Sequence, residues 1–206
     1  MQTLNSVKIA LEKNNITTYI VNNKAEAKDK IANLISPGKT IGLGGSKTVT
    51  ECGILEMLIK GNYTLFNQYD PSLSQEEQLS MRKKGLTADY FITGTNAITQ
   101  KGELVNCDGF GNRVAAMIFG PDKVIIVVGK NKIVADINKA FERIQNWAAP
   151  LNAKRFELKT PCVTDKKCNP EICNPEYKFC NIFTIIKQQK TKERMTLILV
   201  NEDLGF

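Results

Sequence analysis

The sequence contains no histidine, and this absence excludes several kinds of chemistry at once. Ser-His-Asp and Cys-His nucleophile systems in their usual form are excluded, because both use an imidazole as general base. Metal sites with histidine ligands are excluded as well. The chain also lacks the side chain that most often exchanges protons near neutral pH. No carboxylate stands out as a replacement, so the sequence leaves the general base unassigned.

Long hydrophobic runs are also missing. The apolar runs, such as residues 124–128, are short, whereas a membrane-spanning helix needs about 20 apolar residues. We therefore expect no membrane span. The first residues lack the apolar stretch of a signal peptide, which predicts a cytoplasmic location.

Basic residues outnumber acidic ones by 28 to 21, which gives a net charge of +7. The lysines are spread over the whole chain, and no basic stripe alternates with aromatic residues. We therefore expect no nucleic-acid binding. The charge instead indicates a lysine-rich surface and a small anionic metabolite as ligand. The composition leaves a homo-oligomer open.

Helical and strand patterns alternate along most of the chain, which predicts an α/β fold around a mainly parallel sheet. The length fits one domain over residues 1–206, with a cysteine-rich insertion at about 160–181. The predicted helices cover 5–14, 25–35, the segment from a glycine turn to 59, 75–84, 112–119 and 134–147. The predicted strands cover 17–21, 40–43, 63–66, 88–93, 103–106, 123–128, 183–186 and 196–200.

A glycine-rich turn over residues 42–48 joins a predicted strand to a predicted helix. It is no P-loop, because Ser46 and Ile41 stand where that motif needs glycines. It is no dinucleotide fingerprint either, because Lys47 replaces the third glycine. Free N–H groups at a helix start still bind anions, and glycines let a ligand approach. An anion site is therefore predicted, with a ligand-free tight turn as the alternative, at Gly44, Gly45, Ser46, Lys47 and Thr48.

Two further polar segments follow predicted strands. Gly94, Thr95 and Asn96 come after the strand at 88–93, and Asn112 and Arg113 begin a helix. Ligands of open α/β sheets gather at the carboxyl ends of strands. We expect these residues to complete the anion site, with the Arg113 guanidinium binding a carboxylate or phosphate through two hydrogen bonds. The alternative is that they only form turns.

Four of the six cysteines cluster near the end of the chain, at Cys162, Cys168, Cys173 and Cys180. In a cytoplasmic protein such clustering favours a metal over disulfides. Four thiolates can hold either structural zinc or a [4Fe–4S] cluster. The C-x5-C-x4-C-x6-C spacing matches neither a zinc ribbon nor a bacterial ferredoxin, so free thiols or a reversible disulfide remain the alternative.

Several sequence blocks together resemble the LUD (lactate utilisation) domain family. They are Gly42–Thr48, Asp70-Pro71, Thr93–Ile98, Gly111–Arg113 and Pro121–Lys132. The resemblance implies a three-layer α/β sandwich like that of CoA transferases and sugar-phosphate isomerases. It also implies a link to the oxidation of lactate or a similar 2-hydroxy acid, usually with other subunits in an iron–sulfur-dependent system.

Two functions follow from the residues and the resemblance together. In the first, the chain is an enzyme or oxidoreductase subunit of 2-hydroxy-acid metabolism that binds its anionic ligand at the glycine-rich strand ends. In the second, it is a non-catalytic ligand-binding or assembly subunit, and the four-cysteine loop is a structural metal clip. A cysteine cluster close to the anion site would favour the first.

Overall fold

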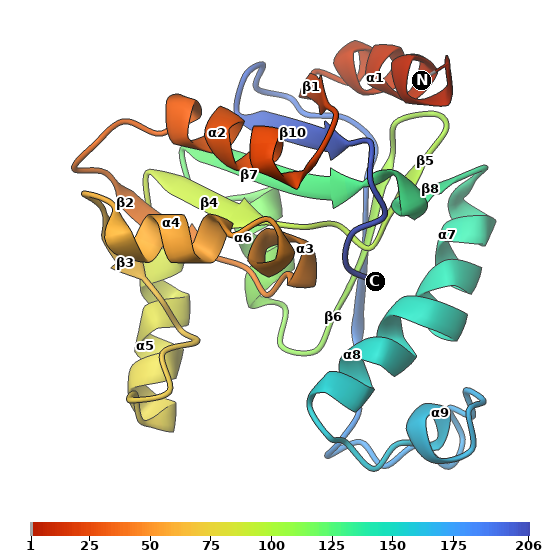
Figure 1. Cartoon of the computed structure of the whole chain (residues 1–206). Helices are drawn as coiled ribbons and strands as arrows, with labels where there is room; N and C mark the ends of the chain where they lie inside the picture. Colours follow the sequence, from red (N-terminus) through yellow and green to blue (C-terminus); the bar gives the residue numbers. More distant parts are fainter. Residues whose placement is uncertain (1) are drawn as a thin grey trace.

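Six parallel strands form the central sheet of the protein, in a computed structural model that describes residues 2–206 (Figure 1). All five pairings are parallel. The long central strand β7 is apolar on both sides because both faces of the sheet are covered. In spatial order the strands are β1 (Thr17–Val21), β10 (Met195–Val200), β7 (Lys123–Gly129), β4 (Tyr90–Thr93), β2 (Thr40–Leu43) and β3 (Thr64–Phe66).

One face of this sheet is covered by α2 (Lys24–Leu34), α3 (Lys47–Glu51) and α4 (Ile54–Lys60). The sequence pattern predicted α3 and α4 as one helix. Gly53 separates them because its backbone is left-handed, with φ +67°, a conformation that glycine adopts without steric cost. The short α3 begins after the three-residue turn that follows β2.

The opposite face carries α1 (Gln2–Lys13), α5 (Gln75–Gly85) and α6 (Asn112–Ile118), together with a second sheet. A capping box at Ser74 starts α5. A Cβ atom on Gly42 would lie 2.8 Å from the backbone of α5 at its last residue, so only glycine permits this close packing.

The second sheet has the order β8 (Ile133–Val134), β5 (Ala97–Thr99), β6 (Leu104–Asp108) and β9 (Ile182–Ile186). The sequence pattern did not predict β5 and β8. It also predicted a strand at 103–106 without separating it from the parallel sheet, whereas β6 pairs antiparallel with β5 and β9. This second sheet places the end of β6 beside the carboxyl ends of β2 and β4.

The helix predicted over 134–147 starts later and runs further. Asp136 caps α7 (Ile137–Arg143) by accepting a hydrogen bond from the Lys139 backbone. A π-helical turn (Ile144–Ala148) then leads into α8 (Ala149–Arg155), which contains a proline in its first turn. The regular backbone hydrogen bonding of the helix changes at this π turn, next to the proline, which has no N–H group to donate. The segment packs on the second sheet.

Together the helices, the parallel sheet and the second layer confirm the predicted three-layer α/β architecture. After α8, the cysteine segment (residues 160–181) begins with the short α9 (Pro161–Thr164) and leads into β9. Over the described residues 2–206, no helix combines the length and the apolar character needed to cross a membrane.

Candidate functional site

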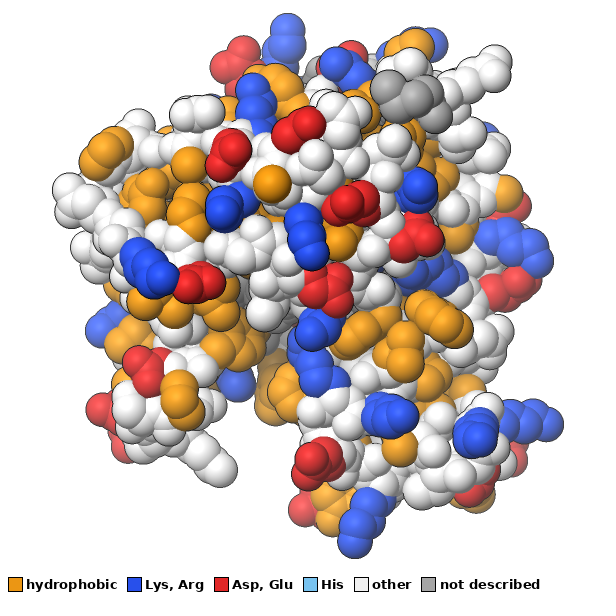
Figure 2. Space-filling model, viewed as in Figure 1, with side chains coloured by type: hydrophobic (Ala, Val, Ile, Leu, Met, Phe, Trp, Pro, Cys, Tyr) orange, Lys and Arg blue, Asp and Glu red, His pale blue; other side chains and the backbone are white. Residues whose placement is uncertain are grey.

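A cavity of about 410 Å³ lies at the carboxyl edge of the central sheet. The turns after β2, β4 and β7 contribute Gly45–Lys47, Gly94–Asn96 and Lys132 to its lining. Figure 2 shows the molecule hollowed between the part that carries α5 and the part that carries α8 and α9. This is the edge where open α/β sheets bind their ligands.

Most residues of the predicted anion site line this one cavity. They are Gly45, Ser46, Lys47, Gly94, Thr95, Asn96, Asn112 and Arg113. The two others lie behind the wall. Thr48 is completely buried, and a Cβ atom on Gly44 would collide with the Thr93 side chain. The predicted clustering of the glycine segments is therefore observed, with Gly44 and Thr48 as supports.

The two glycine turns approach each other closely. Ser46 caps α3, because its Oγ accepts a hydrogen bond from the Val49 backbone at 3.3 Å. A Cβ atom on Gly94 would lie 2.6 Å from that same Oγ. Lys47 remains half-exposed, and its Nζ lies 4.0 Å from the Glu51 carboxylate, so it is held only weakly. Its ammonium is available to a ligand.

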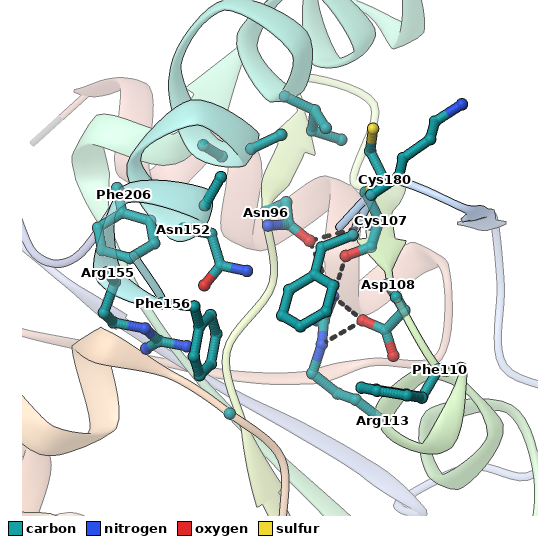
Figure 3. A pocket seen from close by; sticks show the side chains of 18 of the residues that line it. Asn96, Cys107, Asp108, Phe110, Arg113, Asn152, Arg155, Phe156, Cys180 and Phe206 are labelled. Carbon is teal, nitrogen blue, oxygen red and sulfur yellow. Dashed lines mark hydrogen bonds and ion pairs between the residues drawn. The ribbon is translucent and has the colours of Figure 1, made fainter. Parts of the chain in front are cut away.

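Arg113 is buried, and its guanidinium forms hydrogen bonds with other groups of the protein (Figure 3). Its Nη2 lies 2.6 Å from Asp108 Oδ1, and its Nε donates to the same oxygen at 2.8 Å. Further hydrogen bonds run to Gly94 O, Asn106 Oδ1, Asn96 Oδ1 and Cys107 O. A guanidinium has five N–H groups, and these acceptors use all of them. Arg113 therefore has no free N–H group for the direct contact with an anion that the sequence predicted. The geometry instead supports a role in positioning the neighbouring side chains of the cavity.

Lys132 is a cavity residue that the sequence reading missed. Its side chain is 3 % exposed, and its Nζ donates to Thr48 Oγ1 at 3.0 Å. Among residues 2–206, no carboxylate forms an ion pair with it. Burial, and then the charges of Arg143 and Arg113, lower the pKa of Lys132 to about 7. A buried lysine with such a pKa in a cleft is a candidate functional group.

Positive charge dominates the cavity lining. The cations are Lys47, Arg82, Arg113, Lys132, Arg155 and Lys178, and the carboxylates are Asp70 and Asp108. Arg82, Arg155 and Lys178 come from α5, α8 and the cysteine segment, which are distant in sequence. Because Asp108 is already paired with Arg113, Asp70 is the one further carboxylate that the described residues contribute to the cavity lining.

The cysteine segment forms another part of the cavity wall. Cys162, Cys168, Cys173 and Cys180 all line it, together with Cys107. None of the chain's cysteines forms a disulfide. Burial raises the pKa of the Cys180 thiol despite the nearby Lys178 charge. Within the described chain, no three Cys, Asp or Glu side chains are arranged to hold a metal ion. The donor type suits zinc or iron–sulfur, but this arrangement of the segment does not.

The LUD domain family matches residues 4–200 of the sequence. The chain belongs to the LUD domain family. The family resemblance seen in the sequence is thereby confirmed, and the protein is of the lactate-utilisation type in general terms. No curated protein matches the sequence.

Solved structures resemble this LUD domain at low identity. A DUF162 family protein from Deinococcus radiodurans shares 16 % identity, with a TM-score of 0.55 over 97 % of this chain and 96 % of that one. The eIF2B β subunit from Chaetomium thermophilum shares 16 % identity, with a TM-score of 0.40 over 56 % and 44 % of the two chains. Ribose 5-phosphate isomerase A from Neisseria gonorrhoeae shares 14 %, with a TM-score of 0.35 over 55 % and 54 %. The first likeness agrees with the fold described above.

Three phenylalanines of the LUD domain join the walls of the cavity, and we call Phe110, Phe156 and Phe179 the aromatic bridge. The Phe179 ring lies 5.7 Å from that of Phe110 and 5.3 Å from that of Phe156, edge to face. Arg82 lies over Phe110 and Arg155 over Phe156, at 5.0 and 4.6 Å. Such aromatic and cation–π contacts stabilise packing at a partly exposed site. They hold the cysteine segment against α8 and the loop after β6.

Proposed function

We propose that this LUD domain binds a small carboxylic acid in the cavity, as an enzyme or subunit in the oxidation of lactate or a related 2-hydroxy acid. The observation that carries the proposal is the excess of cations over carboxylates in the lining. An anion gains more from such charges in a recessed site than at an open surface, because the effective dielectric constant is lower there. The location at the strand ends supports the same proposal.

The anion contacts are assigned to groups that the protein leaves available. Lys47 is half-exposed and only weakly paired. Gly45 and Ser46 precede α3 and line the same cavity, so we assign their backbone N–H groups as further contacts. In the same cavity, Arg155 lies beside Phe156 and Phe206 (Figure 3). Arg113 holds the Asn96 amide and the Asp108 carboxylate in place from behind.

The test is a titration of the protein with lactate, glycolate and pyruvate, followed by calorimetry and by thermal shift. Lys47→Ala and Arg155→Gln are each expected to weaken binding about tenfold, the effect of losing one charge-assisted hydrogen bond. Lys130→Ala is the matched control, because Lys130 is exposed and lies outside the cavity. Wild-type affinity in both cavity variants, or no binding of any of these acids, would overturn the proposal.

We also propose that the four cysteines take up a metal after a rearrangement of the cysteine segment. The shared lining of cavity and thiols supports this, and it favours a [4Fe–4S] cluster in a redox subunit over a zinc clip in an assembly subunit. Anaerobically purified protein is expected to be brown, with about four iron atoms per chain. Cys168→Ser is expected to lower the iron content, and Cys52→Ala, in the hydrophobic core, is not. Metal-free protein whose thiols all react would contradict the proposal.

A further inference from the structure

The buried amine of Lys132 has no role in the anion contacts assigned above, and the fold surrounds it from several elements. Thr48 accepts its one hydrogen bond and in turn donates to Leu204 O at 3.3 Å. The charged groups that face it are Glu51 on α3, Arg113 on α6 and Arg143 on α7, with the Cys52 thiol beside Glu51. A methionine would fill the same volume without a charge to desolvate. A purely structural reason for an amine here is therefore weak.

Arg143 does not neutralise or pair with this amine. Its Nη1 donates to Asn96 O at 2.8 Å, and its Nε donates to Asn131 O at 3.2 Å. Arg143 thus adds positive charge behind Lys132 while holding the loop after β4. Cationic neighbours and desolvation together are known to keep a lysine amine neutral and nucleophilic. Lys132 itself lines the cavity, together with residues whose positive charges attract carboxylates.

We infer that Lys132 is a nucleophile that forms an imine with a small 2-oxo acid held in this cavity. The inference rests on the proposed function, because the cationic lining has to hold the carboxylate of the acid. A 2-oxo acid carries its carbonyl directly beside that carboxylate. It is also the product expected from a two-electron oxidation of a 2-hydroxy acid.

The step needs no oxidant or reductant. The lone pair on Lys132 Nζ attacks the carbonyl carbon, and one of the two protons of the neutral amine passes to the carbonyl oxygen as the C–N bond forms. The resulting carbinolamine then loses its hydroxyl group together with the second amine proton as water, which leaves the C=N bond of a neutral imine. The pKa of about 7 means that much of the amine is neutral at physiological pH, whereas an exposed lysine is almost entirely protonated.

The experiment incubates the full chain with pyruvate and sodium cyanoborohydride, which reduces an imine to a stable secondary amine. Peptide mapping by mass spectrometry then locates the adduct. At neutral pH we expect Lys132 to be labelled roughly 100-fold more than Lys130, which is exposed in the same turn. Lys132→Met should remove this label and Lys130→Met should keep it. Acetone, a ketone that lacks the carboxylate, should label Lys132 at least tenfold less than pyruvate at equal concentration.

Calorimetry with pyruvate and no reductant distinguishes a failure of the imine inference from a failure of the proposed function. Binding without a label on Lys132 would overturn the inference and leave the proposed function standing. Absence of binding would remove the proposed function, and the inference with it. Equal labelling of Lys132, Lys130 and the cavity residue Lys47 would also overturn the inference, because it would reflect ordinary amine reactivity. Mapping on the wild-type chain keeps the test valid even if Lys132→Met fails to fold.

Discussion

Replacing Arg113 with methionine is expected to lower the free energy of unfolding by about 3–5 kcal/mol, the range found when one partner of a buried ion pair is removed. Both side chains of the pair with Asp108 are 9 % exposed. The variant leaves the Asp108 carboxylate buried without its cation. It also removes one of the two hydrogen-bond donors of the Asn106 side-chain oxygen and one of the two donors of the Asn96 side-chain oxygen. A buried carboxylate carries a large desolvation penalty once its cation is gone.

Thermal unfolding measures this effect directly. For a chain of this size, the loss corresponds to a fall in Tm of roughly 10 °C. Lys47→Met is the control, since its ion pair with Glu51 is long and partly exposed and should matter by less than about 0.5 kcal/mol. A double-mutant cycle with Asp108→Asn should show coupling of about 2 kcal/mol. A fall in Tm as small as that of Lys47→Met would refute the structural role of Arg113.

Replacing Lys132 with methionine is expected to raise the free energy of unfolding at neutral pH, the opposite of the effect expected for Arg113. The pKa of Lys132 falls from its ordinary 10.5 to about 7 on folding. Between these values the unfolded chain binds more protons than the folded one, so wild-type stability rises with pH, by up to about 1.4 kcal/mol per pH unit. The destabilisation is fully present below about pH 7 and disappears toward about pH 10.

Urea unfolding of both proteins at several pH values checks this prediction. Near pH 7 we expect Lys132→Met to be more stable by roughly 3 kcal/mol, after allowance for the lost hydrogen bond to Thr48. The gain should shrink as the pH rises toward about 10. Lys130→Met, in the same turn but exposed, should leave the slope unchanged. A variant with the wild-type pH dependence would show that Lys132 keeps its ordinary pKa. The expected gain is typical of functional groups that a fold retains at some expense of stability.

The sequence predicted the central sheet well where strands are long and apolar. β7 and β10 match their predicted ranges within a residue, because a strand buried on both faces leaves an apolar run. β5 and β8 have only three and two residues. Such short strands exist through pairing with distant segments, and their sequence alone carries no period that reveals them.

The candidate site could be predicted only where its residues form a recognisable local pattern in the sequence. Glycines beside strand ends and four close cysteines are visible in the sequence, and they do share one cavity. The environment of Lys132 arises from Arg143 and from the turn at Leu204, which are remote along the chain. The hydrogen bonding of the Arg113 guanidinium within the protein likewise depends on where β6 places Asp108. The one local signal that was missed is the place of Lys132 in the short turn that follows the most apolar strand.

The aromatic bridge connects the cavity wall to the cysteine segment. Phe179 stands directly before Cys180, and its ring contacts both Phe110 and Phe156. Phe179 and the four clustered thiols belong to the same segment and line the same cavity, so a movement that brings the thiols together would also move part of the cavity wall. Uptake of a metal by the thiols and binding of the acid are therefore expected to influence each other, because both depend on the position of this segment.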